Sequence, residues 1–278
     1  FSYGITGSFS DYTAKYTKCD NPSGLIGDPY VGKKYGEIWG YKVDGLFRTD
    51  EEAAEYASRI DLSTVAAGYY SATGAYGKGV RAGDIKYLDL NGDNIVNGGK
   101  GTLEDPGDRR VIGNSSPRYQ YGATLNFSWY GFDVSVFVQG IGRLDWYPGA
   151  DNLRFWGPYC RPYATFVPKN FMSQVWSEEN PDAYFPRARA YTSLNSNSGT
   201  AYYTNDRYLQ NLAYCRLKNL TIGYTIPRRL TSKVGIKECR IYFSGENLAT
   251  WSALESDFLD PEQAAADSDK KSNVYPWC

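Results

Sequence analysis

Oxygen-bearing side chains recur at alternate positions in residues 89–95, DLNGDNI. This spacing matches the opening half of a loop that wraps a hard cation, because carboxylate, amide and carbonyl oxygens are the ligands that Ca²⁺ prefers. The expected ligands are Asp89, Asn91, Asp93 and the main-chain carbonyl of Ile95. The twelfth position is Lys100 rather than a bidentate Glu, so Asp105 or Asp108 would have to fold back. The alternative is an Asx-rich turn that holds no ion.

A second group of candidate residues is aromatic and lies in a long irregular region, residues 146–207. Structureless stretches longer than about 15 residues are uncommon in compact domains and usually carry function. Aromatic rings with a polar tip suit wet recognition surfaces, where they can stack on sugar rings. The candidates for substrate binding are Trp156, Tyr159, Tyr163 and Tyr191. The alternative is that these rings pack the region against itself.

Enzymatic chemistry is not expected, and no catalytic residue or required cofactor is predicted. The chain has no His, which excludes every mechanism that uses an imidazole base. Glycosidases need two carboxyl groups held together, and no motif places such a pair. Lys plus Arg (30) nearly balances Asp plus Glu (31), so the chain has no basic field for nucleic acid.

The elements that would position these residues are mainly strands. Residues 119–129 alternate strictly, with apolar and aromatic side chains on one face and small polar side chains on the other, and residues 132–138 repeat the pattern after Tyr130-Gly131. A period of two is typical of a strand. Further strands are expected at residues 1–13, 37–47, 81–90, 209–226 and 237–252, with short helices at 50–60, where Asp50 is the expected N-cap, and at 227–235.

Connections between these strands alternate between tight and very long. The turn at residues 130–131 and the link at 227–235 are short, whereas residues 146–207 form a long excursion. Outer-membrane barrels show this alternation, with short periplasmic turns and long outer loops. The pattern therefore favours an all-β chain of antiparallel strands from a large membrane barrel, although a half-buried soluble hairpin would alternate in the same way. Charged strand residues, namely Asp133, Arg216 and Glu246, are expected to face the interior of such a barrel.

Several motifs together resemble the SusC/RagA family of TonB-dependent outer-membrane transporters. The matching stretches are EIWGYKVDGLF (37–47), GDIKYLDLNGDN (83–94), DRRVIGNSSPRYQYGATLNFSWYGFDVSVFVQG (108–140), YCRLKNLTIGYTIP (214–227) and RIYFSGENLATWS (240–252). The resemblance runs over nearly the whole chain and is specific, because no single generic motif carries it. It implies that residues 1–278 are the C-terminal part of a 22-stranded, plugged barrel, with 146–207 as a long extracellular loop region.

The resemblance also implies a function and partners. A family member imports nutrient oligomers through the outer membrane of a Bacteroidetes-like Gram-negative cell. Glycans are the favoured substrate class, and peptides are the alternative. Its partners are a SusD-like surface lipoprotein, TonB, the oligosaccharide or peptide substrate and membrane lipid. On this comparison the plug domain, the TonB-contacting region and the final strand are expected to lie outside the chain, so the segment alone is not expected to transport.

The sequence is also compatible with a protein of a different functional class. A secreted, soluble β-sandwich that binds carbohydrate, with calcium in the 89–95 loop, would also show strands, aromatic residues and an Asp/Asn/Gly loop. The two readings differ in what covers the apolar strand faces. A transporter segment leaves them without an opposing sheet, whereas a sandwich buries them.

Overall fold

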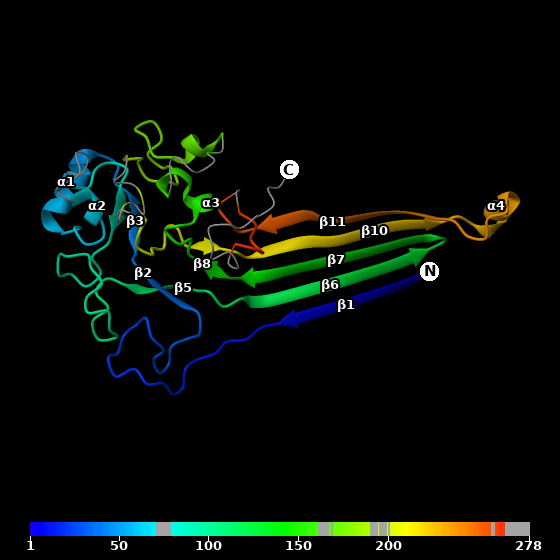
Figure 1. Ribbon diagram of the computed structural model, residues 1–278, viewed down its shortest axis with the longest axis horizontal. Coiled ribbons are helices and arrows are strands. Elements are labelled where there is room, and N and C mark those ends of the chain that lie inside the picture. The colour runs from blue at the N-terminus through cyan, green and yellow to red at the C-terminus, as the bar shows by residue number, and fades with distance from the viewer. Residues whose placement is uncertain are drawn as a thin grey trace. The chain divides into compact units, whose positions relative to one another are not determined.

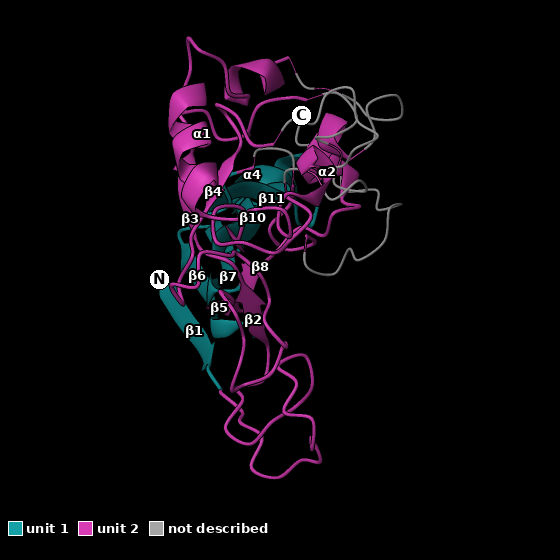
Figure 2. Ribbon diagram, turned by 90° about the vertical axis from the view of Figure 1, so that its left-hand side faces the viewer, with its two compact units in different colours: residues 1–12, 116–144, 211–255 teal, residues 13–115, 145–210, 256–278 magenta. Residues whose placement is uncertain are grey.

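The computed structural model describes residues 1–70, 79–160, 167, 169–189, 194, 199, 201–256 and 259–264. The chain divides into two compact units, shown in Figure 2. Unit 1 contains residues 1–12, 116–144 and 211–255, and unit 2 contains residues 13–115, 145–210 and 256–278. Each unit is thus assembled from segments that are far apart in the sequence.

Unit 1 is one antiparallel sheet of five strands in the order β1-β6-β7-β10-β11, which lie side by side in Figure 1. The strands are β1 (Ser2–Ser10), β6 (Arg118–Trp129), β7 (Phe132–Arg143), β10 (Tyr214–Thr225) and β11 (Arg240–Ser252). Their bounds agree with the predicted strands to within a few residues, except that the strand predicted at 209–226 is divided, because Gln210–Asn211 pairs in a separate ladder. The predicted all-β class with antiparallel strands is therefore confirmed.

Short connections join the strands at one end of the sheet. Tyr130 and Gly131 link β6 to β7 with φ values of 45° and 88°, and two positive φ values are typical of the tight type I′ hairpin turn. Helix α4 (Arg228–Thr231) and the 3₁₀ turn η5 (Ser232–Val234) link β10 to β11. Gly235, with a φ of 74°, is the C-cap that ends the helical part of this link. The short helix predicted at 227–235 is confirmed.

Long connections leave the other end of the sheet, and they form unit 2. Residues 146–207 do so as expected, but β1 also pairs directly with β6, so that residues 13–115 form a second long excursion between neighbouring strands. The sequence alone does not reveal this second excursion, because the direction of β1 depends on a pairing between residues more than 100 positions apart. Unit 2 therefore contains more of the chain than the 146–207 loop region that was predicted.

In its described residues, unit 2 contains short elements held in three two-stranded ladders. The ladders pair β2 (Glu37–Gly40) with β5 (Arg110–Asn114), β3 (Val43–Leu46) with β4 (Ile85–Tyr87), and β8 (Asp145–Trp146) with β9 (Gln210–Asn211). The helical segments in the described part of unit 2 are α1 (Asp50–Arg59), α2 (Ala67–Tyr70), α3 (Leu153–Trp156), η1 (Gly157–Tyr159) and η2 (Phe171–Gln174). The single run predicted at 37–47 is wrong in one respect, because it is two strands with different partners.

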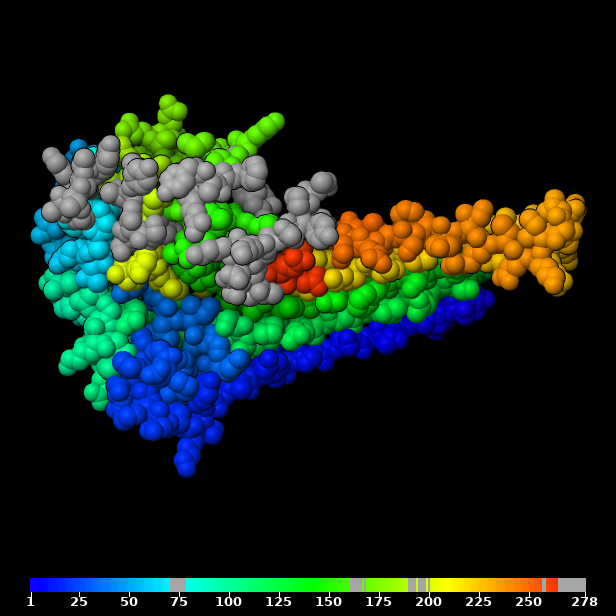
Figure 3. Space-filling view, viewed as in Figure 1, coloured from blue at the N-terminus to red at the C-terminus, as the bar shows by residue number. Residues whose placement is uncertain are grey.

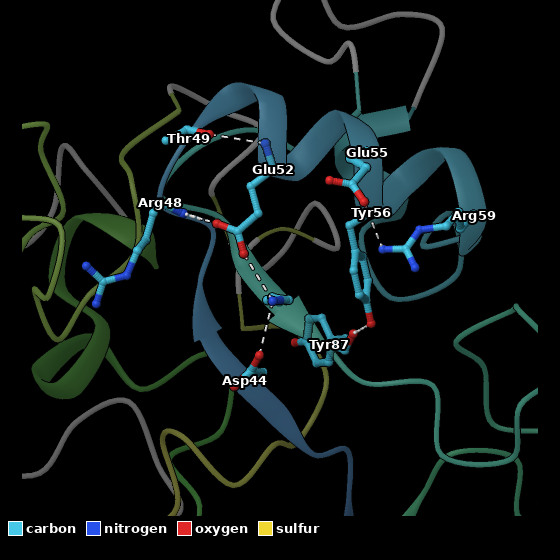
Figure 4. A network of polar contacts seen from close by, with 9 residues as sticks. Asp44, Arg48, Thr49, Glu52, Glu55, Tyr56, Arg59 and Tyr87 are labelled. Carbon is cyan, nitrogen blue, oxygen red and sulfur yellow. Dashed lines mark hydrogen bonds and ion pairs between the residues drawn. The ribbon is translucent and has the colours of Figure 1, made fainter.

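Helix α1 begins as expected, but its N-cap is Thr49 rather than Asp50. The Thr49 side chain accepts a hydrogen bond from the Glu52 amide at 3.1 Å, and the Glu52 carboxylate accepts one from the Arg48 amide at 2.7 Å (Figure 4). This reciprocal pattern resembles a capping box. Asp50 is already helical, and its carboxylate accepts a hydrogen bond from the amide of Ala82 at 2.9 Å.

Lys86 connects helix α1 with the two strands of the β3–β4 ladder. Its ammonium group lies 3.0 Å from the Glu52 carboxylate of α1 and 3.1 Å from the Asp44 carboxylate of β3. Because Lys86 itself belongs to β4, the helix is tied to the β3–β4 ladder by charge-assisted hydrogen bonds. Within the described ranges, no helix combines the length and apolar character needed to cross a membrane.

Candidate functional site

The strand register gathers apolar side chains of all five strands on one face of the unit 1 sheet. Two rows that cross the sheet from β1 to β11 are Ile5, Leu125, Val136, Leu220 and Gly245, and Tyr3, Phe127, Val134, Ile222 and Phe243. The alternation found in one hairpin of the sequence thus extends over the whole sheet. One continuous apolar surface results.

This apolar face has no covering layer within unit 1. Ile5 is 72% exposed, Phe127 41% and Phe243 59%. All residues of unit 1 are described, and they form one sheet and the α4–η5 turn, so no second sheet of unit 1 faces these side chains. In the space-filling view the strands reach the surface of the molecule (Figure 3). A soluble sandwich would bury such a face against an opposing sheet, and unit 1 lacks that sheet.

Aromatic side chains lie at both ends of the apolar face, with aliphatic residues between them. At the tight-turn end Trp129 packs edge-on against Tyr130, and the ring centroid of Phe132 lies 4.5 Å from that of Tyr224. At the other end Phe9 is paired with Tyr121. Eight residues separate Tyr121 from Trp129, which corresponds to about 27 Å along a strand at roughly 3.4 Å per residue. This length is close to the apolar band of about 25 Å, flanked by aromatic girdles, in outer-membrane barrels.

The opposite face of the sheet is polar and carries an ion pair that crosses a strand. Arg240 of β11 donates two hydrogen bonds to the carboxylate of Asp133 of β7, and β10 lies between these strands. The crossing needs Gly223 in β10, because a Cβ atom there would lie 2.6 Å from the guanidinium and 2.7 Å from the carboxylate. Bidentate pairs of this kind are stronger than single ion contacts. The glycine therefore has a specific structural role.

The charged strand residues named from the sequence share this polar face. Asp133 pairs with Gly223, Arg216 with Gln139 and Glu246 with Asn219, all positions opposite the apolar rows. Arg216 also donates a hydrogen bond to the Thr250 hydroxyl at 2.9 Å. The predicted separation of an apolar face from a charged face is confirmed. An enclosed, water-lined interior is the environment that suits such a face.

Trp156 and Tyr159 lie inside unit 2 rather than on a recognition surface. Trp156 is fully buried, donates hydrogen bonds to the carbonyls of Pro148 and Gly149 at 3.2 and 3.0 Å, and lies with its ring centroid 5.0 Å from that of Tyr208. Tyr159 is 3% exposed and donates a hydrogen bond to the Pro186 carbonyl. Their burial favours packing over direct stacking on a sugar ring. Tyr163 and Tyr191, the other two candidates, lie outside the described residues.

The 89–95 segment folds as a chain of Asx turns. Asp89 accepts hydrogen bonds from the amides of Gly92 and Asn94, at 2.7 and 2.9 Å, and Asp93 accepts one from Ile95 at 2.9 Å. Asn91 accepts one from the Asp93 amide at 2.9 Å. Among the described residues no group of three or more His, Cys, Asp or Glu side chains is arranged to hold a metal. Backbone amides thus donate to side-chain oxygens of Asp89, Asn91 and Asp93, and calcium at Asp89, Asn91, Asp93 and Ile95 stays a prediction.

Asp108 folds back onto this loop, as the sequence required of a completing acid. Its carboxylate is buried and accepts hydrogen bonds from the amides of Leu90, Asn91 and Asn97, the shortest at 2.7 Å. Asp108 therefore organises the loop backbone from inside. Asp105 holds the backbone of the next turn in a similar way, because its carboxylate accepts a hydrogen bond from the Lys100 amide at 3.2 Å.

A buried ion pair in unit 2 was not recognised from the sequence. Arg189 donates to the carboxylate of Asp84 at 2.5 Å, and the two side chains are 5% and 0% exposed. Arg189 also donates to the Gly79 carbonyl at 3.0 Å and lies over the ring of Tyr69. Burial raises the pKa of the Asp84 carboxyl to about 6, although the neighbouring guanidinium opposes this shift. The signal in the sequence is the Gly83-Asp84 pair that opens the GDIKY motif, but its partner lies 105 residues away.

Comparisons with known proteins agree with this arrangement. No family model matches the chain. TonB-dependent receptor P26 of Formosa agariphila is 29% identical over 180 residues, which is 65% of this chain and 16% of the relative. TonB-dependent receptor P3 of the same organism is 25% identical over 189 residues, or 68% of this chain and 16% of the relative. The chain thus spans about a sixth of the length of these curated relatives.

The solved structure of the RagAB peptide transporter is similar in fold. It superposes with a TM-score of 0.52 and 16% identity, over 94% of this chain and 24% of that chain. The relatives are named as receptors and the structural neighbour as a transporter, in agreement with the prediction that this chain is not an enzyme. The receptor relatives in sequence and the RagAB peptide transporter in fold thus support the resemblance of this chain to the SusC/RagA-type TonB-dependent transporters.

Proposed function

We propose that this chain forms part of the barrel wall of an outer-membrane transporter that imports nutrient oligomers. The single observation that carries the proposal is the unpartnered apolar face of the five-stranded sheet, with Ile5 and Phe243 more than half exposed. In a bilayer that face contacts lipid chains, and every internal backbone group of the sheet is satisfied by a neighbouring strand. The polar face with the Asp133–Arg240 pair then lines the interior.

The long connections support a role for unit 2 outside the membrane. Residues 13–115 and 145–210 leave the sheet at the end opposite the tight turns, and in outer-membrane barrels the long loops are extracellular. These segments bury aromatic residues in a core of their own, as Trp156 and Tyr208 show. A folded outer unit offers a rigid surface for capture of substrate and for a surface lipoprotein.

The proposed substrates are oligosaccharides or peptides, and the proposed partners are a SusD-like lipoprotein and TonB. The receptor relatives support TonB-driven uptake by their names, and the name of the RagAB peptide transporter points to peptides for that protein. The family resemblance of the sequence motifs supports the lipoprotein partner. Localisation in the outer membrane follows from the same proposal.

The decisive experiment uses the full-length transporter expressed in its own outer membrane. We expect it to co-purify with a surface lipoprotein and to enrich oligomers from a mixture that contains equal amounts of oligosaccharides and peptides, with mass spectrometry identifying which class is retained. A protein recovered from the soluble fraction, monomeric without detergent, would contradict the barrel-wall proposal. Retention of neither class would contradict the import of oligomers.

Calcium binding by the 89–95 loop is a separate proposal with its own test. Titration calorimetry of Ca²⁺ into the full-length protein is compared with a variant that carries Asp89→Ala and Asp93→Ala. If the loop binds the ion, the variant loses the heat of binding. Equal heats would support the Asx turn without an ion, which the hydrogen bonds of Asp89 to Gly92 and Asn94 already complete.

A further inference from the structure

The turn that joins β10 to β11 is basic, apolar and exposed. Residues 227–238 carry four basic side chains and one acidic residue, Glu238. The basic residues are Arg228, Arg229, Lys233 and Lys237. Three apolar side chains stand among them in solvent, with Leu230 58%, Val234 71% and Ile236 46% exposed. We propose that this turn, here called the basic turn (227–238), binds the phosphates of anionic phospholipids in the leaflet at the tight-turn end.

The shape of the basic turn is set by its own hydrogen bonds. The Leu230 amide donates to the Pro227 carbonyl at 2.8 Å, and the Ile236 amide donates to the Thr231 carbonyl at 3.1 Å. Thr231 is the one buried side chain of the turn, at 4% exposure. The Ile226 amide donates to the Cys239 carbonyl at 2.9 Å, which closes the base of the turn on the sheet. The cationic and apolar side chains are therefore presented outward from an ordered backbone.

The depth of the basic turn follows from the aromatic residues beside it. Tyr224 lies three residues before the turn and pairs with Phe132 on the apolar face, and Trp129 and Tyr130 end the neighbouring hairpin. Aromatic side chains of membrane proteins collect at the level of the lipid headgroups. In Figure 1 helix α4 extends beyond the ends of the strands at the tight-turn end of the sheet. The turn is thus continuous with the surface proposed to contact lipid, and the inference rests on that proposed function.

The chemistry of the basic turn matches an anionic lipid surface. Side chains that combine long cationic groups with exposed aliphatic groups bind where headgroup phosphates meet acyl chains. Short periplasmic turns lie on the inner side of outer-membrane barrels, where the leaflet is made of phospholipid. A turn that only needed solvation would gain nothing from exposing Leu230, Val234 and Ile236. The mixture of both kinds of side chain points to lipid.

The test counts lipids bound to the full-length transporter. The protein is exchanged into detergent micelles that contain equal amounts of phosphatidylglycerol and phosphatidylcholine, and native mass spectrometry measures the enrichment of phosphatidylglycerol. The variant replaces the four basic residues by Gln, and the matched control replaces two exposed Arg and two exposed Lys of unit 2. The control positions are Arg59, Arg81, Lys18 and Lys100. Wild type and control are expected to show equal enrichment.

Each basic side chain near an anionic surface contributes a factor of about five to binding, so the variant is expected to lose at least about tenfold in enrichment. Undiminished enrichment in the variant would overturn the inference, as would an equal loss in the control. Loss of uptake without any change in bound lipid would assign the basic turn to a protein partner and also overturn it. A full-length protein that does not enter bilayers would fail earlier and contradict the proposed function itself.

Discussion

The two units use the same side chains in opposite environments. Phe127 and Phe243 of the unit 1 sheet are 41% and 59% exposed, whereas Phe155 and Tyr208 of unit 2 are 1% and 0% exposed. The difference does not come from residue type. It comes from the layer that each unit does or does not provide: unit 2 folds loops around its rings, and unit 1 leaves its apolar face without a covering layer of its own.

The comparison also explains the different roles of polar side chains in the two units. In unit 2, carboxylates such as Asp84 and Asp108 are buried and accept hydrogen bonds from backbone or arginine, which lets long irregular segments hold one shape. In unit 1 the backbone is satisfied by the strand ladder, so side-chain polarity is free to define one face. The backbone of the long loops thus needs buried polar side chains as hydrogen-bond partners, whereas the backbone of the sheet finds its partners in neighbouring strands.

The largest expected effect is in the core of unit 2. Trp156→Ala removes a fully buried ring from the aromatic cluster and should destabilise unit 2 by about 3–5 kcal/mol, because the surrounding rings cannot close the cavity. Hydrogen exchange of the full-length transporter measures the loss in residues 145–189. Trp129→Ala, at a 52% exposed ring of the sheet, is the control and should leave that exchange unchanged. Equal loosening by both variants would remove the contrast between the units.

The next effect probes the apolar face of the sheet. Leu125→Arg places a charge among lipid chains near the middle of the bilayer and should cost about 2–4 kcal/mol of folding into lipid vesicles. Thr124→Arg, one residue away on the polar face, should cost less than about 1 kcal/mol. Denaturant titration of the full-length protein in vesicles gives both values. A reversed order would place the polar face against lipid and break the assignment of the two faces.

A smaller effect is expected from pH in unit 2. Burial raises the pKa of Asp84 to about 6 from an ordinary value of 3.8, so the folded state binds the proton more tightly than the unfolded chain. The contribution of Asp84 to the free energy of unfolding is therefore fully present below pH 3.8 and is lost as pH rises to about 6, by no more than about 3 kcal/mol. Asp84→Asn should flatten this slope in thermal unfolding curves.

The control for this measurement is Asp182→Asn, which alters an exposed carboxylate paired with Arg48. It should leave the pH slope of unit 2 as it is in the parent protein. Asn resembles the protonated carboxyl in charge and shape, so the variant and the parent protein should be most alike in stability at low pH, and the change in slope tests the pKa. A slope that persists in Asp84→Asn would show that another group titrates.

The smallest effect tests the corrected start of helix α1. Thr49→Ala removes the side chain that accepts the Glu52 amide and should destabilise the helix by about 1 kcal/mol. Ser58→Ala, an exposed position whose hydroxyl donates to the Glu55 carbonyl, should change stability by less than about 0.5 kcal/mol. Hydrogen exchange of residues 50–59 compares the two. Greater exchange in the Ser58 variant would argue against the cap.

Much of the fold was predictable because it depends on local patterns. The hairpin 119–138 follows from strict alternation about a two-residue turn, and helix α1 follows from acids in its first turn after a capping residue. The candidate binding residues were predicted less well. Trp156 and Tyr159 were placed in the right region, but whether a ring points to solvent or to its neighbours depends on segments as distant as Tyr208.

By itself the sequence determined which residues share a strand face, where the chain reverses tightly and which family its motifs resemble, because these depend on spacing and residue type within a few positions. Only the tertiary structure decided that β1 pairs with β6, that Gly223 lets Arg240 reach Asp133, and that Asp84 meets Arg189. Each of these contacts joins residues that are separated by about a hundred positions or more, or requires a backbone approach at one glycine. No local pattern encodes such distances, since they arise only when the strands pair and the loops pack.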